Sequence, residues 1–116
     1  MSFDVISATC KLLNQMTKLP ASSLVPAKRP NEFITIERTG GGYSLGRDEV
    51  NLAVQCWAQS EARAYELACI ARVVLSDARE LVSEVCSSRV ESIYSFPDPD
   101  SRAFRYQLDV YMITRP

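Results

Sequence analysis

Residues 33–57 read FITIERTGGGYSLGRDEVNLAVQCW and hold all four glycines of the 116-residue chain, which are Gly40, Gly41, Gly42 and Gly46. The second of the two runs that flank them alternates apolar with polar residues, the period of a strand with one buried face. Glycine adopts conformations that other residues avoid, and a loop of roughly ten residues exceeds the usual two to five of a hairpin. The stretch therefore predicts a β-hairpin whose long glycine-rich loop projects as an arm.

The arm is predicted to be mobile until it meets a partner. Ordering costs about 1–2 kcal/mol of backbone entropy per residue, and three consecutive glycines do not hold one conformation by themselves. We therefore expect residues 39–47 to be poorly ordered in the isolated chain and ordered on assembly. Tyr43 and Leu45 are the predicted apolar anchors, and Arg38 and Arg47 are expected to form ion pairs at the rim.

Helical periodicity precedes and follows this hairpin. Residues 3–18 carry one apolar arc, with Ser2 as the expected N-cap and Pro20 as the end. Residues 20–30, which contain three prolines, predict an extended connection. A second helix is predicted from Glu61 to about Leu75, capped by Ser60, and residues 78–86 form a weaker helical stretch.

The second predicted helix has two apolar stripes, so it needs two neighbours. The main stripe consists of Ala64, Leu67, Ala68, Ala71 and Leu75. The other, nearly opposite, consists of Ala62, Cys69 and Val73. Either the first helix or another subunit covers this second stripe.

The chain ends in a second predicted hairpin. Residues 90–96 and 104–114 form its arms, and residues 97–101, PDPDS, supply the turn. The predicted order is helix, hairpin, helix, hairpin (α-ββ-α-ββ). We expect a single α+β domain over residues 1–116, with two layers, in which helices pack on one face of an antiparallel sheet of two hairpins.

The composition argues against several classes of function. A net charge of −1 favours neither nucleic acid nor an anionic membrane, and no apolar run approaches the ~20 residues of a bilayer span. The chain has no histidine, and its four cysteines form no CxxC pair. We therefore expect no enzymatic activity, no metal and no cofactor. The N-terminus lacks the regions of a signal peptide, which predicts a cytoplasmic chain.

Two motifs have weak functional meanings. Residues 41–48 have the glycine spacing of a phosphate-binding loop, but Arg47 and Asp48 replace the residues that contact phosphate and magnesium, and a strand follows. The arginines beside the glycines, with Lys28 and Arg29, form a basic rim. Such a rim contacts DNA phosphates or forms salt bridges between chains, and neighbouring acidic residues cancel most of its charge.

The central segment resembles the small tail terminator proteins of long-tailed bacteriophages and prophages. The likeness spans roughly residues 3–75. It lies in residues 33–41, residues 48–57, the helix that follows Ser60, and the short proline motifs Lys18-Leu19-Pro20, Val25-Pro26 and Arg29-Pro30.

This resemblance implies a virion protein of the tail, assembled in the cytoplasm of the host bacterium. It implies a self-assembled ring, typically a hexamer, that contacts the tail tube protein and the head–tail connector protein. The expected interface residues come from the arm and the second stripe: Arg38, Gly40, Gly41, Gly42, Tyr43, Leu45, Arg47, Ala62, Cys69 and Val73. A head–tail connector or neck protein, and a small bacterial ligand-binding or regulatory module, are the alternatives.

Overall fold

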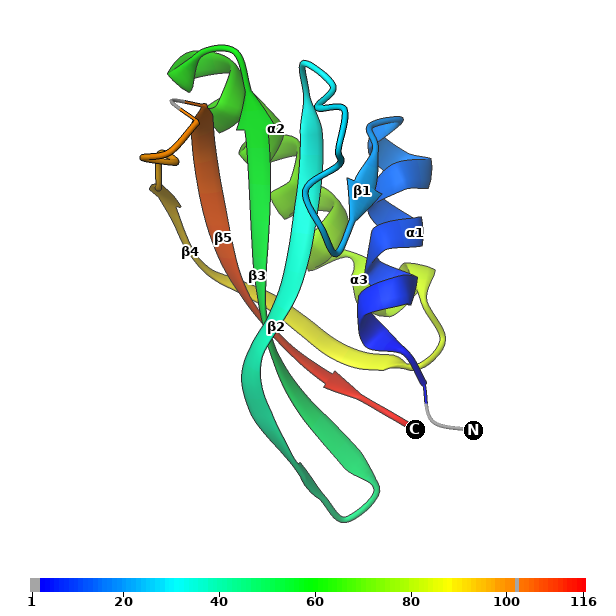
Figure 1. Ribbon diagram of the computed structural model, residues 1–116. Coiled ribbons are helices and arrows are strands. Elements are labelled where there is room, and N and C mark those ends of the chain that lie inside the picture. Colours follow the sequence, from blue (N-terminus) through cyan, green and yellow to red (C-terminus); the bar gives the residue numbers. More distant parts are fainter. Residues whose placement is uncertain (1–2, 102) are drawn as a thin grey trace.

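A computed structural model describes residues 3–101 and 103–116 and has an α+β fold, in which a five-stranded sheet carries its helices on one face (Figure 1). The strand order is β1-β2-β3-β5-β4. The elements are α1 (Val5–Thr17), β1 (Ala21–Ser22), β2 (Phe33–Ser44), β3 (Arg47–Ala58), α2 (Glu61–Ser76), α3 (Ala78–Leu81), β4 (Val85–Ser95) and β5 (Phe104–Thr114).

The two long helices begin at polar caps. The Asp4 side chain accepts a hydrogen bond from the Ser7 amide at 3.0 Å, so Asp4 caps α1. The expected cap, Ser2, lies outside the described residues. The hydroxyl of Ser60 accepts a hydrogen bond from the Arg63 amide at 3.1 Å, which confirms the predicted start of α2.

The core lies between the sheet and the two long helices. The predicted main stripe of α2 is buried throughout, and Val74 joins it. It meets alternate residues of the sheet, such as Leu52, Val54 and Leu108, each at most 1% exposed. The predicted apolar set of β3 is buried, but Ala53 and Trp57 on the other face are buried as well, so β3 is more buried than the half-buried strand that was predicted.

The sheet is mixed rather than purely antiparallel, because the connection after α1 adds one strand. Ala21 and Ser22 of β1 pair in parallel with Ile34 and Thr35 of β2, and the carbonyl of Pro20 accepts a hydrogen bond from the Ile34 amide at 2.8 Å. A strand of two residues has no periodicity that a sequence pattern could reveal. The prediction of two hairpins alone therefore missed it.

The predicted ten-residue glycine loop is wrong. Strands β2 and β3 continue through the glycines, and register pairs run from Gly40 opposite Asn51 to Ser44 opposite Arg47. Only Leu45 and Gly46 lie between the strands, with φ angles of 53° and 76°. Two consecutive positive φ angles are those of a tight type I′ turn. The expected mobile loop is thus a paired β-hairpin.

The C-terminal hairpin is longer at its start than expected. Strand β4 begins at Val85 rather than at Val90, and the helical stretch predicted for residues 78–86 shrinks to α3. Cys86 consequently lies in a strand. The pairing of β4 shifts between Val85 and Ser87 and again between Val90 and Ser92. These two irregularities interrupt the alternation of period two, which hid the strand in the sequence.

Candidate interaction surface

The far end of the β2–β3 hairpin, residues 38–51, is the most prominent projection of the molecule and is here called the arm. It extends beyond both long helices at the lower end of Figure 1. Neither helix covers it, and most of its side chains are exposed. Strand β5 pairs with β3 as far as Asp48 opposite Thr114, so the arm has strand support on the β3 side alone.

Arg38 braces the base of the arm. Its guanidinium forms a two-point ion pair with the Asp48 carboxylate, at 3.0 and 2.8 Å, which raises the pKa of Arg38. The same guanidinium donates to the carbonyls of Gly40 and Glu49, each at 3.1 Å. Arg38 was expected to pair with another chain, but its hydrogen bonds lie within the arm. Arg47 stands exposed beside the turn and forms no ion pair with any described residue.

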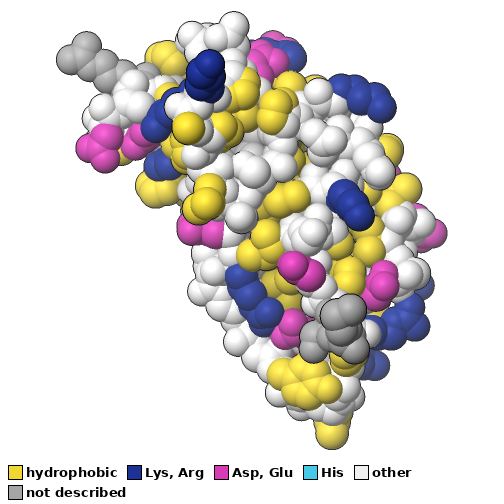
Figure 2. Space-filling view, turned by 45° about the vertical axis from the view of Figure 1, so that its right-hand side comes forward, with side chains coloured by type: hydrophobic (Ala, Val, Ile, Leu, Met, Phe, Trp, Pro, Cys, Tyr) yellow, Lys and Arg dark blue, Asp and Glu magenta, His cyan; other side chains and the backbone are white. Residues whose placement is uncertain are grey.

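The tip of the arm is apolar. Leu45 is 97% exposed and Tyr43 is 67% exposed, and hydrophobic side chains cover the lower end of the molecule in Figure 2. Leu45 also adopts a left-handed φ of 53°. A residue with a Cβ is strained there, and asparagine or glycine is the usual choice at this turn position. The tip thus combines maximal exposure of an apolar side chain with an unfavourable backbone conformation.

The glycines of the arm fall into two groups. Gly41 has a φ of 115°, and a Cβ built on it would lie 1.8 Å from the Glu49 carbonyl oxygen, so the fold requires glycine there. Gly46 occupies a turn position with a φ of 76°. Gly40 and Gly42 have no such requirement. A Cβ on Gly42 would meet nothing within 4 Å, and one on Gly40 would meet only the Asn51 side chain at 3.8 Å.

The second predicted stripe of α2 faces away from the sheet. Val73 is 60% exposed, Ala62 is exposed and Cys69 is half-buried. Helix α1 packs beside α2, yet it leaves this stripe open, so α1 is not the neighbour that covers it. Tyr65 and Ile70, which are 50% and 44% exposed, widen the stripe, and Ile70 was not among the predicted interface residues.

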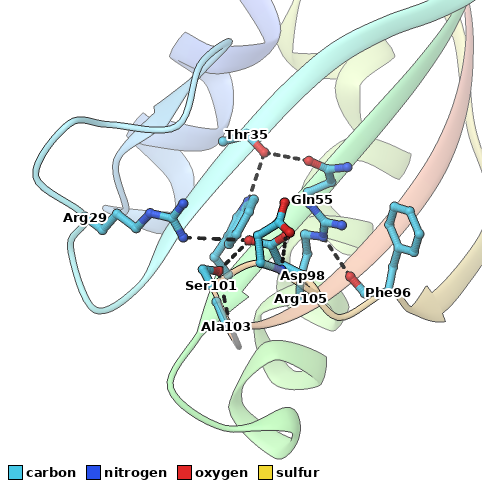
Figure 3. Close-up of polar contacts among 10 residues, drawn as sticks. Arg29, Thr35, Gln55, Phe96, Asp98, Ser101, Ala103 and Arg105 are labelled. Atoms are coloured by element: carbon cyan, nitrogen blue, oxygen red, sulfur yellow. Dashed lines mark hydrogen bonds and ion pairs between the residues drawn. The ribbon is translucent and has the colours of Figure 1, made fainter.

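The open face of the sheet carries a chain of polar side chains at directly opposed positions on β2, β3, β5 and β4. Thr35 Oγ1 donates to Gln55 Oε1 at 2.9 Å, as Figure 3 shows, and Gln55 Nε2 donates to Gln107 Oε1 at 3.0 Å. Gln107 Nε2 in turn donates to the Tyr94 hydroxyl at 2.7 Å. This row of hydrogen bonds crosses four strands, and each side chain in it has a hydrogen-bond partner.

Trp57 lies at the β2 end of this hydrogen-bonded row and is only 3% exposed. Its indole nitrogen donates to Thr35 Oγ1 at 3.0 Å. The ring stacks on Phe33 at 5.1 Å, and the guanidinium groups of Arg29 and Arg105 lie 5.4 and 4.8 Å from its centroid. Cation–π contacts therefore join three separate segments at this end of the sheet.

The β4–β5 loop is fastened to the same end. Asp98 accepts hydrogen bonds from the Ser101 hydroxyl and the Asp100 amide and lies 4.0 Å from Arg29. The Ser101 hydrogen bond, followed by that of the Asp100 amide and the charge of Arg105, lowers the pKa of Asp98. Arg105 donates to the Phe96 carbonyl at 2.7 Å (Figure 3).

Of the four cysteines, Cys69 alone belongs to the α2 stripe, and Cys86 is exposed in β4. Cys56 is buried in the core, and burial raises the pKa of its thiol to about 12. Within the described residues, no three His, Cys, Asp or Glu side chains gather into a possible metal site. None of the described helices is both long and apolar enough to cross a membrane.

In comparison with known proteins, no family model and no curated protein matches the chain.

Proposed function

We propose that this chain is a structural protein of a bacteriophage or prophage tail, which caps the tail tube as a ring of copies and joins it to the head connector. The proposal combines the resemblance of residues 3–75 to tail terminators with the two exposed apolar surfaces, the tip of the arm and the stripe of α2. One observation carries it furthest, the strained and exposed Leu45.

Leu45 is hard to explain by the stability of the isolated chain. A left-handed conformation costs a residue with a Cβ roughly 1–2 kcal/mol, and Leu45, at 97% exposure, gains almost nothing from burial. Strained residues that persist in a fold mark functional positions, because only another requirement offsets their cost. A partner with an apolar pocket supplies that requirement. We assign this role to the tail tube protein or the head–tail connector protein.

A ring also needs a contact between copies. The α2 stripe, with Ala62, Cys69 and Val73, offers one apolar surface, and the edges of the sheet offer another. Tyr43 and Leu45 then remain available at the tip for the second kind of partner. The arm is paired through its glycines and braced by Arg38, so it presents the tip without the entropy cost of ordering a loose loop.

The proposal is tested with the variant Leu45→Asn in a phage or prophage that lacks its own copy of the protein. Asparagine suits the left-handed turn position, so the variant is expected to fold at least as stably as the parent. Function is expected to fail, with tails of aberrant length or tails that do not join heads. Leu45→Met, which keeps an apolar tip, serves as the control and is expected to complement.

Two results would contradict the proposal. Full complementation by Leu45→Asn would mean that the tip makes no essential apolar contact with a partner. A count of hundreds of copies per purified tail would indicate a tube subunit instead of a cap. The expected count is a small fixed number per particle.

A further inference from the structure

We propose that copies of this chain join edge to edge, with the glycine-rich outer edge of β2 in one copy paired to the outer edge of β4 in the next. The inference rests on the proposed ring, and it names the surface through which neighbours in that ring meet. It also assigns a role to Gly40 and Gly42, which the fold of the single chain does not explain.

The outer edge of β2 is an open pairing site. Strand β1 covers only Ile34 and Thr35, so from Ile36 to Ser44 no described strand lies on that side of β2. Backbone amides and carbonyls along such an edge are available to pair with an added strand. From Arg38 onward this edge belongs to the arm, which neither long helix covers.

Gly40 and Gly42 mark this edge as a place of close approach. Glycine within a strand weakens it and indicates a position where another backbone or ligand comes near. Neither residue has a positive φ, and space for a side chain exists at both. They stand opposite Asn51 and Glu49, on the open face of the sheet. The bare surface thus lies on the face that carries Trp57 and Gln55, away from the helices.

A second copy of the chain is the partner that fits, because its other long edge runs in the correct direction. Strand β4 is antiparallel to β5, β5 to β3, and β3 to β2, so β4 and β2 are antiparallel to each other. A rotation about an axis along the strands keeps their directions. The β4 edge of one copy then meets the β2 edge of the next as an antiparallel pair, and the contact repeats from copy to copy.

The side chains of β4 complement the bare positions on β2. Arg89 and Tyr94 point to the open face, where Arg89 packs over Tyr111 and Tyr94 donates to Asp109. Large side chains over an edge glycine are a known way to complete a sheet. The β4 edge is bent by its two irregularities and carries the exposed Arg89–Glu91 pair. These features disfavour pairing with an ordinary flat strand, whereas a strand without side chains leaves room for them.

Cysteine cross-linking tests the contact on the purified full chain. Gly42→Cys is combined in turn with Ser87→Cys, Arg89→Cys and Tyr94→Cys, after Cys10, Cys69 and Cys86 are replaced by serine. Cys56 is left in place because its buried thiol is unreactive. Paired strands hold opposed Cα atoms about 4.5–5.5 Å apart, which suits a disulfide. A ladder of dimers, trimers and larger species is expected from at least one combination.

The pattern of the ladder separates this contact from others. A two-fold contact of β2 with β2 links Gly42→Cys alone and stops at dimers, which would overturn the proposal, as would monomers in all three combinations. The experiment needs no tails. A ladder together with full complementation by Leu45→Asn would retain the edge contact and reject the proposed function. Monomers together with failed complementation by Leu45→Asn would reject the edge contact alone.

Gly42→Val tests the role of the bare positions. It is expected to leave the melting temperature unchanged or raised. It is also expected to reduce, at least tenfold, cross-linking between Ser44→Cys and the β4 cysteine that opposes it in the register found with Gly42→Cys, which is Ser87→Cys where Gly42→Cys links to Arg89→Cys. Gly46→Asn is the matched control: it removes a glycine from the turn, away from the edge, and is expected to cross-link as the parent does. Equal cross-linking by the Gly42→Val variant would overturn the role assigned to the glycines.

Discussion

The two long hairpins of this sheet have strands of nearly equal length, but their connecting loops differ in character. Strands β2 and β3 have 12 residues each, and β4 and β5 have 11 each. The β2–β3 hairpin closes in a tight turn that points into solvent and exposes Leu45. The β4–β5 hairpin ends in a polar loop that is fastened to the body by the contact of Asp98 with Arg29 and by Arg105 over the Trp57 ring.

The difference shows how one sheet separates stability from contact. The β4–β5 hairpin contributes buried side chains at the core and satisfies its loop with internal hydrogen bonds. The arm contributes little to the core beyond Val50, yet it is internally braced and ends in unburied apolar atoms. Substitutions in the β4–β5 hairpin should therefore change folding, and substitutions in the arm should mostly change assembly.

The largest effect is expected from Leu108→Ala in β5. Leu108 is fully buried between the sheet and the helices, and truncation of a buried leucine costs about 2–5 kcal/mol. Urea unfolding followed by circular dichroism measures the loss. A loss smaller than about 1 kcal/mol would mean that this hairpin is not part of the cooperative core.

Gly41→Ala should be the one glycine substitution in the arm with a large effect on folding. The added Cβ would lie 1.8 Å from the Glu49 carbonyl oxygen at a φ of 115°, and such strain costs about 1–3 kcal/mol. Relative to the parent, the backbone amides of this variant should exchange hydrogen faster in the arm, with a smaller change in the body of the sheet. Gly42→Ala is the matched control, and its expected change is within about 0.5 kcal/mol. Equal losses in the two variants would contradict the arm geometry.

The internal hydrogen bonding of the β4–β5 loop should depend on pH. Because the pKa of Asp98 is lowered in the folded chain, its contribution to stability is present above its ordinary value of 3.8 and is lost as the pH falls through the folded pKa. Asp98→Asn should therefore melt below the parent at pH 7, and the difference should shrink toward pH 3. Asp100→Asn, a neighbour in the same loop, should leave the melting temperature unchanged. A difference for Asp98→Asn that grows on acidification would refute this account.

The smallest effect on folding is expected at the tip. Leu45→Asn relieves a left-handed leucine, so the free energy of unfolding should stay constant or rise by up to about 1 kcal/mol. Thermal unfolding of the purified variant measures the change. A clear decrease would show that the Leu45 side chain packs within its own chain and would weaken its role as an anchor.

The sequence predicted α2 well because several signals agree there: the Ser60 cap, the apolar spacing and a run of good helix formers. The arm was mispredicted because a leucine, not the usual asparagine or glycine, opens its turn. The start of β4 was hidden because its irregularities shift the alternation twice. The order and pairing of Thr35, Gln55 and Gln107 depend on strand register between distant segments, and no local pattern specifies that register.

Trp57 is the single tryptophan of the chain, and its surroundings make it a selective optical reporter. Phe33 and two guanidinium groups from separate segments surround its ring, so its emission is expected to change when they separate. It lies at the opposite end of β3 from the turn, about 33 Å away for ten extended residues. The Trp57 emission should therefore change when the body of the sheet unfolds. It should not change when the arm frays or binds a partner. A probe placed at the tip, read beside Trp57, would reveal whether the two ends of this sheet melt together.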